Sequence, residues 1–484
     1  MESLSSRVLR GSAWVGALRI VQKGMGMARE IILARLLFPE DFGLFGIATL
    51  LLLGFEVLTR TGFEDAIIHI RDNVEPYLHT SYWIQVLRGF LLGLLVYVGA
   101  PFVAQFFGEP QVTPIIRVLA VVQVLRGIRS IGVVVLRREM NFRDESFFQA
   151  TGVLTNFLVT VGLGVLYRDV WALVWGQVAA ETVLAIASFW FHSYRPRFTF
   201  DKEKAVELFQ YGVWLLGAGI VSYIALQADN IVAGRWVGAS ALGVYQMGYL
   251  VSNLPAKEVA KQLSKVVQSG YAEIQQDKQR LRTVYQKTLL TVWAIVLPAT
   301  VGMMITADVF VPVLLGDKWL DIVPILPILA LGALFRAIGS SIGALFKATG
   351  HTSFVFRVEA LRAVTLLIGL VLVVTFQADL ISIAWAFAAS TVVMISVSLF
   401  LVSKTVGGVY SLLRNALPSL GAVTIMVAAV YGLSIAYAEG VVYLRLVALV
   451  GMGATVYISA HALIERWASF RPIRLVYHTV RERL

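Results

Sequence analysis

Residues 78–104, LHTSYWIQVLRGFLLGLLVYVGAPFVA, form a long apolar run whose polar side chains lie mainly in its first half. An α-helix needs about 20 residues to cross the roughly 30 Å of hydrocarbon in a bilayer. Apolar runs of comparable length recur along nearly the whole chain. The sequence therefore predicts an all-α, polytopic membrane protein with no room for a separate soluble domain.

The composition excludes an ordinary soluble fold. Of the 484 residues, 58% are hydrophobic and only 15% are charged, and the mean hydropathy is +0.76. A soluble domain cannot hide so much apolar surface in its core, so lipid must cover part of it. Because the chain has no cysteine, disulfides and thiolate metal sites are excluded.

Apolar runs bounded by glycine, proline or charge predict about fourteen transmembrane helices, six of them before a polar break and eight after it. We expect helices near residues 11–37, 42–66, 78–104, 112–136, 147–166, 170–192, 208–237, 240–268, 284–307, 321–348, 352–376, 380–403, 412–436 and 440–464. The predicted parts are an N-lobe at 1–194, a cytoplasmic inter-lobe loop at 195–207, a C-lobe at 208–404, two further helices within 405–466, and a basic amphipathic cytoplasmic tail at 467–484.

The loop charges predict the orientation. Lys and Arg concentrate in every second connection, starting with Arg7 and Arg10, whereas few lie in the opposite connections, such as Arg168 and Arg445. Because cytoplasmic loops collect positive charge, both termini are expected in the cytoplasm. The net charge of +11 is therefore attributed to topology and lipid headgroups rather than to nucleic-acid binding.

A weak internal repeat relates the two halves. A shift of 200 positions aligns ILARLLFPEDFGLF with IVAGRWVGASALGVY and places Gly43 on Gly243 and Arg35 on Arg235. Since six helices separate equivalent positions, both halves enter the membrane from the same side, as a parallel repeat. We expect two pseudo-symmetric six-helix lobes around a central cavity, an arrangement typical of alternating-access transporters.

Ionisable residues inside predicted helices indicate a pathway, because charge is costly in a bilayer. We expect unpaired cations at Arg19, Lys23, Arg88 and Arg126 to bind a mobile anion such as phosphate. The full set of predicted cationic cavity residues is Arg19, Lys23, Arg60, Arg88, Arg126 and Arg336. The alternative for Arg60, beside Glu56 or Glu64, and for Arg362, beside Glu359, is an ordinary ion pair.

Amide and aromatic side chains near the middle of the predicted helices suit sugar hydroxyls. The predicted sugar contacts are Gln85, Gln123, Gln227, Asn230, Gln246, Tyr249 and Asn253. Carboxylates within the membrane are hypotheses for binding a coupling proton or Na⁺. These are Glu30, Glu56, Glu64 and Asp229.

Enzyme signatures are absent from the sequence. It has no GxxxxGK[ST] loop for ATP, no HExxH motif and no histidine cluster. We therefore expect a protein that is not an enzyme, with no catalytic or metal-binding residues and no cofactor beyond a coupling ion.

Three stretches carry a resemblance to a known family: RGSAWVGALRIVQKGMGMAREIILARLLFPEDFGLFGIATLL at 10–51, NFRDESFFQATGVLTNFLVTVGLGV at 141–165, and FQYGVWLLGAGIVSYIALQADNIVAGRWVGASALGVYQMGYLVSNLP at 209–255. Across essentially its whole length the chain resembles the polysaccharide transporters (Wzx-type oligosaccharide flippases) of the multidrug, oligosaccharidyl-lipid and polysaccharide exporter superfamily.

The resemblance implies a flippase for undecaprenyl-diphosphate-linked oligosaccharide repeat units, driven by an ion gradient or membrane potential. It places the protein in a bacterial or archaeal cytoplasmic membrane, in exopolysaccharide or O-antigen biosynthesis, beside membrane lipids and a polysaccharide polymerase or export machinery. The alternatives are an ion-coupled multidrug antiporter, for which an acidic or apolar cavity is expected, and a lipid scramblase or non-transporting partner of a polysaccharide synthase.

Overall fold

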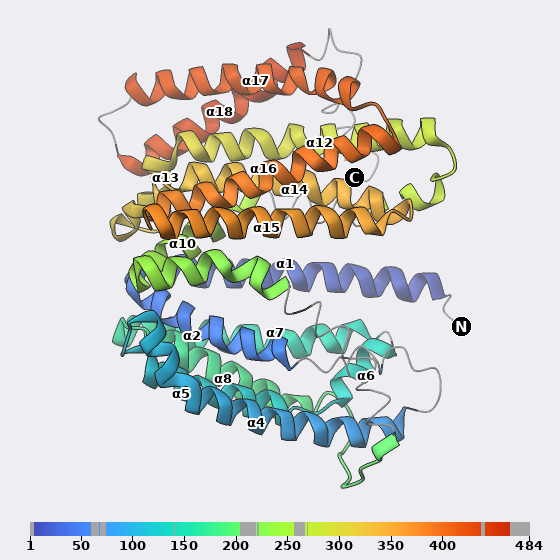
Figure 1. The fold of residues 1–484 in the computed structure, drawn as a ribbon, viewed down its shortest axis with the longest axis vertical. Helices are drawn as coiled ribbons and strands as arrows, with labels where there is room; N and C mark the ends of the chain where they lie inside the picture. Colours follow the sequence, from blue (N-terminus) through green and yellow to red (C-terminus); the bar gives the residue numbers. More distant parts are fainter. Residues whose placement is uncertain are drawn as a thin grey trace. The chain divides into compact units, whose positions relative to one another are not determined.

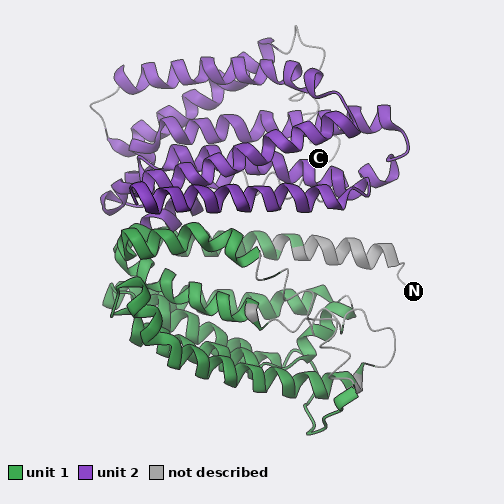
Figure 2. Cartoon of the chain, viewed as in Figure 1, with its two compact units in different colours: residues 1–243 green, residues 244–484 purple. Residues whose placement is uncertain are grey.

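The computed structural model describes residues 4–59, 67, 74–139, 141–203, 219, 222–255, 267–268, 270–436 and 441–464. The chain divides into two compact units, unit 1 at residues 1–243 and unit 2 at 244–484 (Figure 2). This division falls within one helix, α10. The lobe boundaries predicted at 194 and 208 remain predictions, and the predicted tail at 467–484 lies outside the described residues.

Unit 1 is built from long helices packed side by side (Figure 1). Its described elements are α1 (Leu4–Leu36), α2 (Pro39–Leu58), α4 (Glu75–Phe107), α5 (Val112–Ile128), α6 (Gly132–Arg138), α7 (Phe142–Tyr167), α8 (Trp171–Ser188), the short π-helix η1 (Ala233–Val237) and the start of α10 (Ala239–Ser252). Residues 222–232 are also helical. Neighbours in sequence pair most extensively, α4 with α5 and α7 with α8, and α1 packs on α7.

Unit 2 contains the end of α10 and a second set of helices (Figure 1). These are α12 (Lys278–Ile305), α13 (Ala307–Leu314), the 3₁₀ helix η2 (Asp317–Ile322), α14 (Leu326–Ala348), α15 (Thr352–Phe376), α16 (Leu380–Thr405), α17 (Val409–Ala436) and α18 (Val442–Ile464). The pairs α15 with α16 and α17 with α18 are antiparallel neighbours joined by short connections, and α14 packs on α16.

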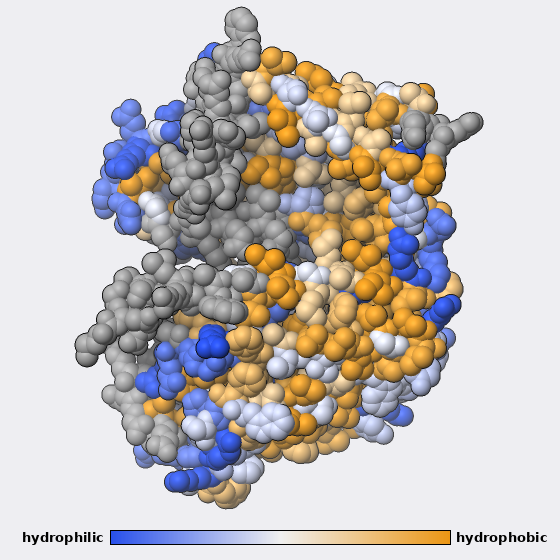
Figure 3. Space-filling model, turned by 180° about the vertical axis from the view of Figure 1, so that it is seen from behind, coloured by the Kyte–Doolittle hydropathy of each residue, from blue (hydrophilic) through white to orange (hydrophobic). Residues whose placement is uncertain are grey.

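Nine helices in the described part of the chain are long and apolar enough to span a membrane, and a bent pair, α5 with α6, adds a tenth. The outer face of α4 shows why lipid is the solvent, because Leu87, Leu91, Leu94 and Val98 are all exposed. In Figure 3 the visible face is largely hydrophobic over its middle, and hydrophilic residues gather at the helix ends. The protein is a multi-pass membrane protein, and the count of fourteen helices stays a prediction.

The prediction of one continuous helix at 112–136 is wrong, because the structure has two helices there, α5 and α6, with a bend of 59° between them. The carbonyl groups at the end of α5 lose their helical partners there. Gln85 of α4 compensates, since its side-chain amide donates to the carbonyl oxygens of Arg126, Gly127 and Arg129 at 3.0, 3.2 and 3.0 Å. On the far side of the break, the Ser130 amide donates to Ser188 Oγ at 2.8 Å.

Small residues allow α4 and α5 to approach closely. A Cβ atom added to Gly89 would lie 2.6 Å from the Cα of Gly127 and 2.8 Å from the carbonyl oxygen of Gln123. Such contacts between glycines are common in membranes, where van der Waals packing drives helix association. The close crossing brings the polar residues of α4 and α5 next to one another.

Candidate functional site

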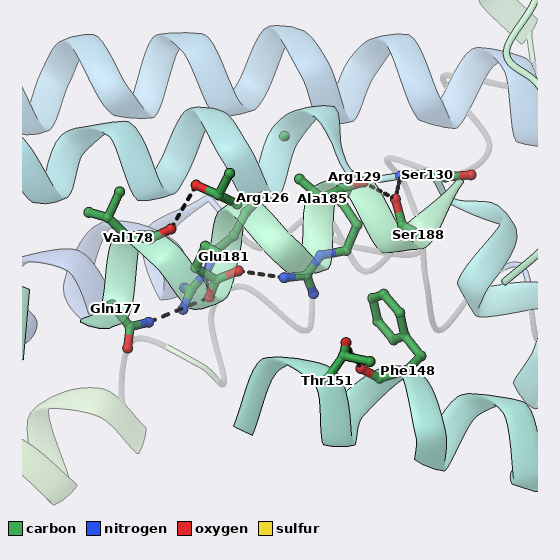
Figure 4. Close-up of polar contacts among 12 residues, drawn as sticks. Arg126, Arg129, Ser130, Phe148, Thr151, Gln177, Val178, Glu181, Ala185 and Ser188 are labelled. Atoms are coloured by element: carbon green, nitrogen blue, oxygen red, sulfur yellow. Dashed lines mark hydrogen bonds and ion pairs between the residues drawn. The ribbon is translucent and has the colours of Figure 1, made fainter. Parts of the chain in front are cut away.

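Five charged residues of unit 1 meet among membrane-spanning helices, and we call them the charged cluster. Four of them lie on helices: Glu56 on α2, Arg88 on α4, Arg126 on α5 and Glu181 on α8. The fifth, Arg129, lies in the break that follows α5. All five are connected by hydrogen bonds or ion pairs, described below, and part of the arrangement is drawn in Figure 4.

Glu181 is the buried centre of the charged cluster, with a side chain that is only 8% exposed. One carboxylate oxygen accepts from Arg126 Nε at 3.0 Å, and the other accepts from Arg129 Nη2. Gln177, one turn earlier on α8, donates to the same carboxylate at 3.5 Å. Figure 4 shows the two guanidinium groups approaching Glu181 from α5 and from the break. Charge-assisted bonds of this kind fix the position of a buried carboxylate.

Arg126 also reaches a second carboxylate, in a more open position. Its Nη1 donates to Glu56 Oε2 at 2.5 Å, and the two side chains are 33% and 42% exposed. Arg126 is thus shared between a buried partner on α8 and a half-exposed partner on α2. Because opposite charges flank it, both carboxylates raise the free-energy cost of moving the guanidinium away.

Arg88 attaches the end of α2 to α4. Its Nε donates to Thr59 Oγ1 at 3.1 Å, and its Nη2 donates to the backbone carbonyl of Glu56 at 3.1 Å. The last carbonyl groups of a helix have no partner within the helix. Arg88 supplies one, so the backbone at Glu56 is held independently of the Glu56 side chain.

The expectation that Arg126 is an unpaired cation is wrong, because it pairs with Glu56 and Glu181, and Arg88 is hydrogen-bonded to Thr59 and to the Glu56 carbonyl. The charged cluster sets three arginines against two glutamates, which leaves one net positive charge. The physical reason is that carboxylates from α2 and α8 converge on the same place as the arginines, and paired charge costs far less in a membrane than isolated charge. Arg126 and Glu56 are both partly exposed, and each is therefore accessible to a ligand.

Two predicted sugar contacts near the charged cluster, Gln85 and Gln123, make hydrogen bonds to the backbone of neighbouring helices. Gln85 donates to the three carbonyl groups at the end of α5, as described above. Gln123 is buried, 3% exposed, and its amide donates to the carbonyl oxygen of Leu52 at 3.4 Å. Both amides join helices, and a direct role in sugar contact stays a prediction.

The predicted residues of α1 lie outside the charged cluster. Arg19 and Lys23 are exposed side chains on that helix. Glu30 is half-buried and paired with Arg29, which also donates to Asn156 of α7. Arg60 and Glu64 lie outside the described residues.

A second set of predicted residues meets at the segment 222–232 in unit 1. The Asn230 side-chain amide donates to Gln227 Oε1 at 3.0 Å, and its backbone amide donates to Asp229 Oδ1 at 2.9 Å. Asp229 is only 4% exposed. The three side chains form a local polar group next to η1.

Unit 2 brings three predicted residues together. Arg336 of α14 donates to the hydroxyl of Tyr249 on α10, and Asn253 Nδ2 donates to the Tyr249 carbonyl at 2.8 Å. The Tyr249 ring contacts Phe387 edge-on, with centroids 5.5 Å apart, and Gln246 is half-buried one turn earlier on α10. The contacts join an arginine, a phenol and an amide, which are groups that can bind the hydroxyls of a saccharide.

One prediction about charge pairing has a clear outcome, and one pairing was not predicted. The ion pair of Arg362 with Glu359 is confirmed, at 2.9 Å, with the Arg362 side chain 5% exposed. Arg129 and Glu181 were missed by sequence reasoning, although each is an ionisable residue at or within a predicted helix, which is itself a signal. Glu181, in the run WGQVAAETVLA at 175–185, is the stronger omission because it has no nearby basic residue on its own helix.

Comparison with known proteins agrees with this architecture. The family model described as polysaccharide biosynthesis protein matches residues 32–324. The lipopolysaccharide biosynthesis protein WzxC of Escherichia coli is 25% identical over 408 residues, which cover 84% of this chain and 83% of WzxC. The teichuronic acid biosynthesis protein TuaB of Bacillus subtilis is 24% identical over 398 residues, covering 81% of this chain and 82% of TuaB.

A solved structure shares the fold. The lipid II flippase MurJ, in an inward closed conformation, superimposes with a TM-score of 0.75 at 16% identity, over 93% of this chain and 98% of MurJ. The family match extends over more than half of the residues. The chain therefore belongs to the family of polysaccharide biosynthesis proteins.

Proposed function

We propose that the protein is a flippase that moves an undecaprenyl-diphosphate-linked oligosaccharide across a bacterial or archaeal cytoplasmic membrane by alternating access. The names of its relatives support a role in polysaccharide biosynthesis, and the fold that it shares with a lipid II flippase supports a lipid-linked substrate. In this proposal both termini lie in the cytoplasm, because Lys and Arg concentrate in the connections on the same side as the termini.

The observation that carries the proposal is the charged cluster, which has a half-exposed arginine in the middle of a membrane-spanning unit. A guanidinium group binds phosphate oxygens through two parallel hydrogen bonds. Arg126 is 33% exposed, so one side of it is open to a ligand while Glu181 holds the other. A diphosphate is the charged part of a lipid-linked saccharide, and it is the group that most needs such a partner inside a bilayer.

The other parts of the substrate have matching surfaces. The polar group of Arg336, Tyr249 and Asn253 suits the hydroxyl groups of a saccharide. The exposed apolar faces, such as the leucines of α4, leave the prenyl tail in contact with lipid. The protein on this account binds the head group and excludes the tail.

The driving force in this proposal is a proton or Na⁺ gradient, with Glu56, Glu30 and Asp229 as the described carboxylates that could bind the coupling ion. Glu56 is the most open of these carboxylates, at 42% exposed, and Asp229 is the most buried. In this proposal the protein is not an enzyme and uses no ATP. The translocated substrate is then bound by a polymerase or export machinery.

Reconstitution in liposomes tests the proposed function against its rivals. The full-length protein is placed in vesicles that contain a fluorescent undecaprenyl-diphosphate oligosaccharide, a fluorescent phospholipid or a cationic dye, and a membrane-impermeant quencher reports exchange between leaflets. Protein-dependent exchange of the oligosaccharide lipid alone is expected. Equal exchange of the phospholipid would identify a scramblase, movement of the dye alone would identify a multidrug transporter, and no exchange would leave a non-transporting partner.

A further inference from the structure

Arg336 is a cation near the middle of the membrane-spanning helix α14, and roughly 15 Å of helix separates it from either end. Among the described residues its side chain has no acidic partner, and its one hydrogen bond is the donation from Nη1 to the Tyr249 hydroxyl. Arg362 of α15, in contrast, is paired with Glu359 at 2.9 Å. Because a cation without a counter-charge is costly inside a membrane, Arg336 indicates a place for an anion.

The groups that Arg336 and Tyr249 leave for a ligand are hydrogen-bond donors. The Tyr249 oxygen already accepts from Arg336, and among the described residues the Tyr249 proton and the Nε and Nη2 groups of Arg336 have no acceptor. Edge-on contact with Phe387, with centroids 5.5 Å apart, fixes the Tyr249 ring. A sugar hydroxyl both donates and accepts, whereas a carboxylate only accepts. A carboxylate therefore matches this set of donors better than a hydroxyl does.

The face of α14 that carries Arg336 is accessible from the C-terminal end of the helix. Arg336, Ser340, Gly343 and Lys347 follow one another on this face at helical spacing. Ser340 and Lys347 are exposed, Arg336 and Gly343 are half-buried, and a Cβ atom on Gly343 would meet nothing within 4 Å. A face in contact with lipid carries large apolar side chains, as the outer face of α4 does. Small and polar residues here instead indicate a watery path along which an anion reaches Arg336.

We infer that Arg336 and Tyr249 bind a carboxylate of the saccharide, so that the substrate is an acidic oligosaccharide that contains a uronic acid or another carboxylated sugar. The inference rests on the proposed function and names the class of substrate within it. An acidic sugar supplies the counter-charge that Arg336 lacks among the described residues, and the arginine in turn lowers the free-energy cost of carrying that carboxylate through the membrane. A neutral saccharide does neither.

The test compares two undecaprenyl-diphosphate disaccharides that differ in one group, a terminal glucuronic acid against a terminal glucose. The full-length protein in nanodiscs is titrated with each, and the readout is the ratio of the two dissociation constants, which isolates the sugar carboxylate because tail and diphosphate are shared. We expect the wild type to bind the acidic lipid about tenfold more tightly, the size of effect typical of a hydrogen bond to a charged group. Arg336→Gln should bring the ratio to about one, and Arg336→Lys, which keeps the charge without the planar fork, should retain part of it.

Arg357→Gln is the matched control, because it removes an exposed arginine from the same unit and should leave the ratio at its wild-type value. An equal loss in this control would reveal a long-range charge effect and overturn the inference. Equal weakening of both lipids by Arg336→Gln would identify the diphosphate as the anion and would also overturn it.

The wild type provides a test that needs no variant. A wild-type ratio of about one, with leaflet exchange of both lipids intact in liposomes, would sink the acidic-substrate inference and leave the flippase standing. A wild type that exchanges neither lipid would remove the proposed function itself.

Discussion

Gly43 of α2 lies against the first residue of α10, and Gly243 of α10 lies against the first residue of α2. A Cβ atom on Gly43 would collide with the carbonyl of Ala239, and a Cβ atom on Gly243 would collide with the carbonyl of Pro39. Residues 39 and 239 are related by the same shift of 200 positions that relates the two glycines. Reciprocal contacts of this kind are the signature of an approximate two-fold relation, here between the first turns of α2 and α10.

This contact predicts that neither glycine tolerates a side chain. Gly43→Ala and Gly243→Ala should each destabilise the protein by about 1–3 kcal/mol, the usual cost of overpacking, because the obstacle is backbone. Gly99→Ala is the matched control, since a Cβ on Gly99 of α4 meets nothing within 4 Å and alanine favours a helix. Thermal unfolding in detergent should show lower midpoints for the first two variants only. Equal midpoints in all three would argue against the close approach.

Glu181→Ala should be strongly destabilising. The variant leaves Arg126 and Arg129 without the carboxylate that both contact. Breaking a buried ion pair in this way costs about 3–5 kcal/mol of folding free energy. We expect the lower figure here because both arginines are partly exposed. Glu145→Ala, from the more open pair with Arg137, should cost about 1 kcal/mol or less. Denaturant unfolding monitored by tryptophan fluorescence compares the two. A similar loss in both variants would contradict the distinction between a buried centre and an ordinary ion pair.

The substitution His79→Ala should weaken the attachment of residues 194–197, which follow α8, to α4. His79 Nδ1 accepts from the Arg197 amide at 3.1 Å and contacts the Tyr194 hydroxyl at 2.9 Å, so the variant loses two hydrogen bonds of about 1 kcal/mol each. Limited trypsin digestion should then cut after the exposed Arg197 about tenfold faster. His351→Ala, at an exposed histidine in unit 2, should leave the rate unchanged. Unaltered cleavage in His79→Ala would show that other contacts hold the segment.

Tyr249→Phe should separate saccharide recognition from diphosphate binding. The variant removes the hydroxyl that accepts from Arg336 and keeps the ring that contacts Phe387. One lost hydrogen bond of about 1 kcal/mol predicts an exchange rate of the oligosaccharide lipid about fivefold lower. Exchange of undecaprenyl diphosphate without sugar should be unaffected, and an equal loss for both lipids would contradict a sugar-binding role.

The sequence predicted most helices well because apolar runs and polar breaks are local signals. The helix expected at 352–376 matches α15, and that expected at 380–403 ends two residues before α16 does. The break between α5 and α6 was missed because its stabilising group, the Gln85 amide, lies on another helix. No pattern within residues 112–136 reveals a partner supplied by α4.

The candidate site shows the same limit. Arg88 and Arg126 were identified from the cost of burying charge, and the structure places both in the charged cluster. Their pairing with Glu56 and Glu181 could not be predicted, because it depends on how α2, α5 and α8 pack. Single ionisable residues are visible in a sequence, whereas their partners are a property of the tertiary structure.

Leaflet exchange of the fluorescent undecaprenyl-diphosphate oligosaccharide in Arg126→Gln liposomes tests the central claim most directly. The double variant Arg126→Gln with Glu56→Gln keeps the charge balance of the site, and Arg137→Gln removes an arginine from another ion pair of unit 1. We predict exchange at least about tenfold slower in both Arg126 variants, because a phosphate partner is lost, and a normal rate in Arg137→Gln. Wild-type rates in both folded Arg126 variants would contradict the claim that the charged cluster carries the diphosphate.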